Sequence, residues 1–158
     1  MHLFSSTLRV ARFGGCSFPD ADGGSNSMLR LPLLNQLSLL NVAISESSLR
    51  SLLDGCPVLE SLLLAERTCS CIQIISGTLK SIGLQSGSGG TTMLQELIIE
   101  DAPLLERFIF VGTGFSGVVV SIISAPKLGV LGNLPVNGFI LKFGTEIIFL
   151  IRTGKEVL

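Results

Sequence analysis

One glycine-rich loop in the sequence has the spacing of a phosphate-binding site. Residues 112–117, Gly-Thr-Gly-Phe-Ser-Gly, match the G-x-G-x-x-G pattern and directly follow a predicted strand. A dinucleotide site also needs a helix after the third glycine and an acidic residue about 20 positions further on. Here a β-branched run follows, and no Asp or Glu occurs between Gly117 and Glu146. We therefore interpret the loop as a turn between strands, with nucleotide binding as an alternative.

Thiols and carboxylates are the other groups that could carry chemistry. Cys69 and Cys71 have the spacing of a short metal or redox pair, but no second pair lies nearby, and the only histidine is His2. A catalytic triad would also need that histidine as its base. The adjacent carboxylates of Glu100 and Asp101 are interpreted as part of a solvated turn. The sequence thus predicts no catalytic residue, no metal site and no cofactor, and it predicts that Cys69 and Cys71 pack in the core.

Composition and charge argue against several classes of partner. The 158 residues are 47% hydrophobic, which is enough for one domain with a continuous core. The chain has 11 Lys and Arg residues against 12 Asp and Glu residues, with no basic cluster, so we expect no binding to nucleic acid or to a membrane surface. It also lacks Trp and Tyr, which are common binding anchors and stacking platforms for bases.

The longest apolar stretch is too short to cross a membrane. It covers residues 139–151, is interrupted by Lys142 and Glu146, and falls below the roughly 20 residues that a span requires. We expect a strand pair or a poorly formed end there. The four cysteines are irregularly placed and no secretory leader is recognised, so we expect a reducing compartment, either cytoplasmic or nuclear.

A repeated pattern defines the elements that position these residues. The motif Leu-x-x-Leu-x-Leu, with other apolar residues allowed, recurs at intervals of 26, 25, 20, 26 and 23 residues. These intervals are typical of leucine-rich repeats, in which each repeat adds one strand to a concave parallel sheet. The sequence therefore predicts an α/β fold, a leucine-rich-repeat solenoid of about six coils. Its matches begin at Leu8, Leu34, Leu59, Leu79, Leu105 and Leu128.

The convex side is expected to mix strands, helix and loops. A seventh match at residues 94–99 falls out of step with the others, so we place it on the convex side. Two β-branched runs, residues 71–75 and 118–123, also lie between concave strands and are predicted as convex strands. In the second coil we predict a helix instead, with Ser45 or Ser47 as its N-cap.

The outward positions of the concave strands are the candidate binding residues. Side chains alternate between the two faces of a strand, so the third and fifth positions of each match point away from the core. Concave sheets of solenoids commonly bind partners, although each of these residues could instead simply face water. Leu63 and Ile109 are the most informative, because exposed apolar side chains can mark a contact patch. The candidates are Arg12, Gln36, Ser38, Ser61, Leu63, Ser81, Arg107 and Ile109.

Three phrases of the sequence are more specific than the leucine spacing. They are LDGCPVLESLLL at residues 53–64, LQELIIEDAPLLERFIF at 94–110 and VVVSIISAPKLGVLGNL at 118–134. These phrases resemble the leucine-rich region of plant F-box proteins that often end in an FBD domain. The resemblance implies repeats that present a substrate to a cullin ubiquitin ligase, in which a separate F-box docks on a Skp-type adaptor. No F-box is recognised ahead of Leu3.

We therefore expect two regions and a non-enzymatic role. Residues 1–134 are assigned to the leucine-rich-repeat domain, and residues 135–158 to an atypical C-terminal segment without a complete FBD domain. The leading hypothesis is a protein-interaction module that selects a protein substrate for ubiquitylation. A Skp-type adaptor would be a partner only if an F-box is supplied elsewhere. One alternative is a truncated, non-functional fragment, and the other is nucleotide binding through the glycine-rich loop.

Overall fold

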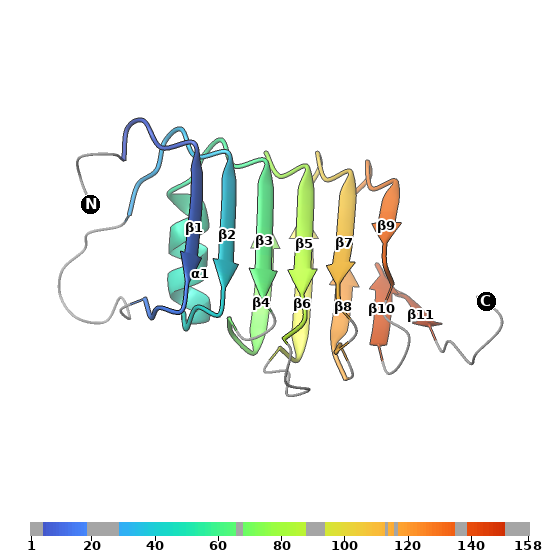
Figure 1. Cartoon of the computed structure of the whole chain (residues 1–158). Coiled ribbons are helices and arrows are strands. Elements are labelled where there is room, and N and C mark those ends of the chain that lie inside the picture. The colour runs from blue at the N-terminus through green and yellow to red at the C-terminus, as the bar shows by residue number, and fades with distance from the viewer. Residues whose placement is uncertain are drawn as a thin grey trace.

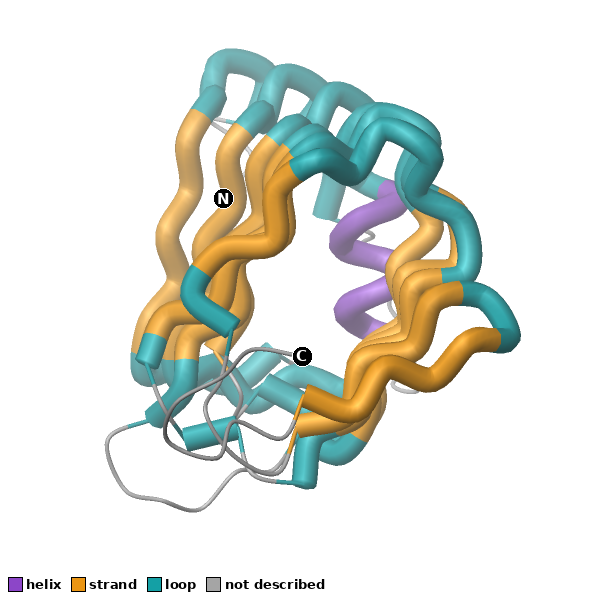
Figure 2. Tube along the Cα trace, turned by 90° about the vertical axis from the view of Figure 1, so that its right-hand side faces the viewer, coloured by secondary structure: helices purple, strands orange, loops and turns teal. Residues whose placement is uncertain are grey.

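The chain winds in six coils through two β-sheets that face each other across one core (Figure 1). The computed structural model describes residues 5–18, 29–65, 68–87, 94–112, 114–115, 117–134 and 139–150, with the backbone alone for residues 147–150. Figure 2 looks along the stack of coils and shows the two strand layers on opposite sides, joined by turns. This arrangement confirms the predicted solenoid.

The first sheet contains all six predicted concave strands, which run parallel. Their register is constant: Leu37 pairs with Leu62, Leu62 with Ile82, and Ile82 with Phe108. Because no strand is offset, inward residues of successive coils stack in rows, and the leucine ridge is buried between coils. The strands, in spatial order, are β1 (Val10–Gly14), β2 (Gln36–Leu40), β3 (Ser61–Ala65), β5 (Ser81–Gln85), β7 (Arg107–Val111) and β9 (Val130–Gly132).

The second sheet forms the opposite layer and confirms the three predicted convex strands. They are β4 (Cys71–Ile75), β6 (Glu96–Asp101) and β8 (Val119–Ile122), which are parallel neighbours. After them come β10 (Phe139–Phe143), parallel to β8, and β11 (Glu146–Leu150), antiparallel to β10. The predicted strand pair is therefore an antiparallel hairpin, and the second sheet continues beyond residue 134.

A helix takes the place of a second-sheet strand in the second coil. It is α1 (Glu46–Asp54), which lies next to β4 (Figure 1). Ser45 rather than Ser47 is the N-cap, because its Oγ accepts a hydrogen bond of 3.2 Å from the backbone N–H of Ser48. At the C-cap, a Cβ on Gly55 would lie 2.2 Å from a neighbouring carbonyl oxygen, so only glycine fits there. Within the described ranges, no helix is long and apolar enough to cross a membrane.

Phenylalanine rings tie the two layers together at the C-terminal end of the stack. The ring of Phe110 on β7 lies 4.7 Å from that of Phe108, 5.4 Å from that of Phe115 and 4.9 Å from that of Phe139, measured between centroids. All four rings are buried. Edge and tilted ring contacts of this kind stabilise a core beyond the burial of area alone. The hairpin is thereby anchored to the repeats through Phe139.

Candidate interaction surface

The outward side chains of the first sheet form one surface, which we call the first-sheet face. The constant register places them in rows that run across the strands. All eight predicted binding residues lie in two adjacent rows of this face, and none belongs to the core. The first row contains Val10, Gln36, Ser61, Ser81, Arg107 and Val130, and the second contains Arg12, Ser38, Leu63, Gly83, Ile109 and Gly132.

An apolar strip lies in the middle of the first-sheet face. Leu63 and Ile109 are half-buried, and each leans on a glycine of the next strand. A Cβ built on Gly83 would lie 2.8 Å from Leu63 Cδ1, and one on Gly132 would lie 3.5 Å from Ile109 Cγ1. Sequence reasoning identified the two aliphatic residues but missed the role of the glycines, which let the side chains lie flat against the sheet. The strip can contact an apolar group of a partner.

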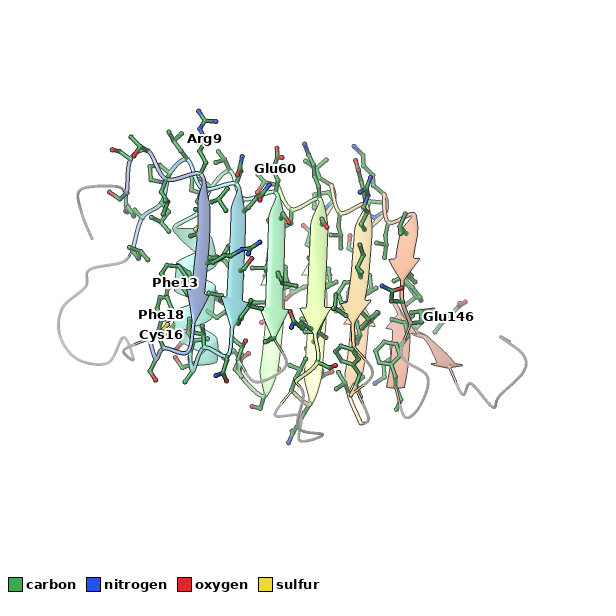
Figure 3. All side chains as sticks on the ribbon, in the orientation of Figure 1. Arg9, Phe13, Cys16, Phe18, Glu60 and Glu146 are labelled. Atoms are coloured by element: carbon green, nitrogen blue, oxygen red, sulfur yellow. The ribbon has the colours of Figure 1, made fainter. Side chains whose placement is uncertain are left out.

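The charges on the first-sheet face are all of one sign. Arg12 and Arg107 are exposed, and the described outward positions of this sheet hold no carboxylate. At the edge where the strands begin, the charges alternate in sign, as Figure 3 illustrates with Arg9 and Glu60. Glu60 is paired there with Lys80 at 3.2 Å, an exposed pair of the kind worth about 0.2–1 kcal/mol. The excess of positive charge therefore lies on the face and not on that edge.

The opposite side of the molecule, formed by α1 and the second sheet, is called the second-layer face. Its described charged residues are six carboxylates and two cations. The coil thus carries positive charge on one side and a net negative charge on the other. The carboxylates are those of Glu46, Asp54, Glu96, Glu100, Asp101 and Glu146, and the cations are Arg50 and Lys142.

A hydrogen-bonded chain crosses the second-layer face. Arg50 on α1 donates to Gln73 Oε1 on β4, and Gln73 Nε2 donates to Glu100 Oε2 on β6. The amide thus connects a guanidinium with a carboxylate over three elements. Sequence reasoning missed this network, because nothing in the sequence shows where α1 docks beside β4. These two hydrogen bonds fix α1 on the second sheet, and none of the three side chains is a nucleophile.

The surroundings of Cys56 and Cys69 favour the protonated thiol. Burial raises the pKa of Cys56 to about 11. Burial, followed by the negative charges of Glu46 and Cys71, raises the pKa of Cys69 to about 11. Thiols that stay protonated at neutral pH are poor nucleophiles and poor metal ligands. The core packing expected for Cys69 and Cys71 is found in part, since both are half-buried and Cys69 packs against the core. Cys56 is buried and Cys16 is exposed.

The pKa of Cys71 is also raised, by burial first and then by Glu46 and Glu96. Its backbone oxygen accepts a hydrogen bond from the Cys69 thiol at 3.4 Å, so the two cysteines meet through a thiol and a carbonyl. In the part of the chain that the structure describes, no three His, Cys, Asp or Glu side chains are arranged to hold a metal ion. The Cys-Ser-Cys motif therefore leads into β4, which begins at Cys71.

The glycine-rich loop is a turn between the two sheets, as predicted. Gly112 and Gly117 have φ values of 100° and 81°, which favour glycine. Phe115 is fully buried, so the loop is anchored in the core. The strand β8 follows, where a dinucleotide site would require a helix. Residues 113 and 116 lie outside the described residues.

Comparison with known proteins places the chain in a family. The family model for the leucine-rich repeats of FBD-associated F-box protein At5g56370 matches residues 1–153. No curated protein and no solved structure matches the chain. The match covers nearly the whole sequence and agrees with the six-coil solenoid. The chain therefore belongs to the family of leucine-rich repeats of FBD-associated F-box proteins.

Proposed function

We propose that the chain is a protein-interaction module that serves as the substrate-recognition repeats of an F-box type ubiquitin-ligase adaptor in plants. Membership of the repeat family supports this role. The observation that carries it is the first-sheet face, where an apolar strip, hydroxyl and amide groups, and two arginines lie in adjacent rows. The sheet hydrogen-bonds its own backbone, so these side chains are available to a partner.

The proposed binding residues divide by their chemistry. Leu63 and Ile109 would supply apolar contact at the centre, and Arg12 and Arg107 would pair with carboxylates of the partner. The remaining four would hydrogen-bond polar groups around the strip, as the polar surroundings of an interface commonly do. These four are Gln36, Ser38, Ser61 and Ser81.

The role requires no chemistry within the chain. A non-enzymatic module positions a substrate, and an F-box supplied elsewhere would recruit the Skp-type adaptor, in the cytoplasm or the nucleus. Residues 1–134 would form the recognition domain. Residues 135–158 would form a separate C-terminal segment, in which the β10–β11 hairpin would cap the second sheet, since terminal repeats of solenoids need capping.

The adaptor role is tested by supplying an F-box as the docking motif. The chain is fused to an F-box and combined with a Skp–cullin ligase and a protein that the unfused chain captures. We expect ubiquitylation of that protein by the fusion, and no ubiquitylation by the same fusion carrying Leu63→Asn on the first-sheet face. Ubiquitylation that persists in the Leu63→Asn fusion would contradict the proposed function.

A further inference from the structure

The charged and apolar groups on the first-sheet face have a spacing that a complementary ligand would have to match. Arg12 lies on β1 and Arg107 on β7, with β2, β3 and β5 between them. Four steps of about 4.8 Å between neighbouring strands, with an offset of two residues or about 6.6 Å along them, separate the two positions by about 20 Å. Leu63 on β3 lies midway, two strands from each arginine, and Ile109 lies on the same strand as Arg107.

No described carboxylate pairs with either arginine on this face. Among the described residues, the ion pair of the chain joins Lys80 to Glu60 and involves neither Arg12 nor Arg107. Glu106, which precedes Arg107, lies before the strand, at the edge where the strands begin. A carboxylate brought to either guanidinium would form a charge-assisted hydrogen bond, and the planar group favours bidentate geometry.

From this arrangement we infer that the first-sheet face binds an acidic peptide segment, and this inference rests on the proposed function. An extended peptide advances about 3.3 Å per residue, so a span of about 20 Å corresponds to about six residues. The segment carries two carboxylates about six positions apart, which pair with Arg12 and Arg107. Apolar side chains between them contact Leu63 and Ile109.

The charge on the other side of the molecule supports this choice of partner. The second-layer face carries six carboxylates and two cations among its described residues, so it repels an acidic segment. Complementary charge on one side and like charge on the other steer the segment to the first-sheet face. A basic segment would experience the opposite preference.

A defined probe tests the inference. The probe is the peptide Ser-Glu-Ala-Leu-Ser-Leu-Ala-Glu-Ser, whose two Glu residues are six positions apart, and the matched probe carries Gln in place of both. Binding to the whole chain is followed by NMR titration, which detects weak complexes. We expect shifts of first-sheet amides, affinity about tenfold higher for the Glu probe than for the Gln probe, and weaker binding at high salt.

Charge-reversed variants provide the control. Arg12→Glu combined with Arg107→Glu is expected to lower affinity for the Glu probe about tenfold or more. Arg30→Glu combined with Lys127→Glu changes the net charge equally at exposed positions outside the strands, and is expected to leave the affinity within about twofold. Equal losses in both double variants, or a Glu probe that binds no better than the Gln probe, would overturn the inference.

The two proposals fail in different ways. If the Glu probe fails but capture of a protein partner still depends on Leu63, the acidic segment is wrong and the interaction surface stands. If partner capture is also independent of Leu63, the proposed function fails as well. A variant that loses its structure is recognised by a narrower spread of its amide resonances. The Gln probe tests the same charge pairing on the unmodified chain, where no substitution can disturb the fold.

Discussion

The side chain of Leu63 on β3 lies across Gly83 on β5, in the middle of the first-sheet face. A Cβ added to Gly83 would approach Leu63 Cδ1 to 2.8 Å, so the glycine provides the space in which the leucine lies flat. A glycine within a strand otherwise costs about 0.5–1 kcal/mol relative to alanine. Its position here is explained by the neighbouring side chain.

The effect of substituting Gly83 on the free energy of unfolding is therefore expected to depend on whether Leu63 is present. In a Leu63→Ala background, Gly83→Ala should raise the free energy of unfolding by about 0.5–1 kcal/mol, because the added methyl meets open space. With Leu63 present, the gain should be smaller, because the leucine must move. Urea unfolding of the four proteins measures the coupling. Equal gains in both backgrounds would show that the two residues do not touch.

The ring contacts of Phe110 give a second prediction. Phe110→Ala removes a ring that touches three others and should lower the free energy of unfolding by about 3–5 kcal/mol. The adjacent Val111 points outward and is 44% exposed, so Val111→Ala serves as the matched control, with a change within about 0.5 kcal/mol. Chemical denaturation followed by circular dichroism compares the two. Similar losses would contradict the assigned orientation of β7.

The N-cap of α1 distinguishes two serines. Ser45→Ala should cost about 0.5–2 kcal/mol of stability, because it removes the acceptor for the N–H of Ser48. Ser47→Ala is the control, since Ser47 lies exposed in the first turn and caps no backbone N–H among the described contacts. Thermal or urea unfolding measures both. A larger loss of stability for Ser47→Ala than for Ser45→Ala would contradict the assignment of Ser45 as the N-cap.

Stability should fall in alkaline solution because of the buried thiols. Burial raises the pKa of Cys56 to about 11, whereas an unfolded thiol ionises near about 8.5. The folded state thus binds the thiol proton more tightly than the unfolded state does. The resulting contribution to the free energy of unfolding is fully present below about pH 8.5 and is lost as the pH rises through about 11. Cys69 acts in the same direction, so Cys56→Ala should flatten this decline in part.

Urea unfolding between about pH 8 and pH 11 measures the effect of Cys56. The chain contains no Tyr, so this range is free of phenol titration. Cys16→Ala is the control, because that thiol is exposed and its substitution leaves the buried Cys56 in place. An equally steep decline in wild type and Cys56→Ala would show that the buried thiol does not contribute.

The repeat architecture could be predicted because its signal is local. The apolar fourth and sixth positions of each match mark the buried ridge, and alternation along the strand directs the third and fifth positions outward. Leu63 and Ile109 occupy such positions and are half-buried. The hydrogen bond from Arg50 to Gln73 could not be predicted in this way, because it depends on where α1 docks beside β4.

The loop around Phe115 shows another limit of the sequence. Its glycines predicted a turn, which is correct, but a turn rich in glycine and serine gives no sign that its aromatic side chain is buried against Phe110. The burial arises because the turn passes over the space between the two layers. Local composition describes the backbone of such a segment and leaves its long-range packing undetermined.

The most direct test of the account compares two matched substitutions on opposite sides of the coil. Leu63 on β3 and Ile98 on β6 are both half-buried aliphatic residues at outward, central strand positions. The measurement is the affinity of Leu63→Asn and Ile98→Asn for a protein captured by the wild-type chain. We predict a loss of about tenfold or more for Leu63→Asn and little change for Ile98→Asn. Equal affinities for the two variants would contradict the assignment of the first-sheet face as the binding surface.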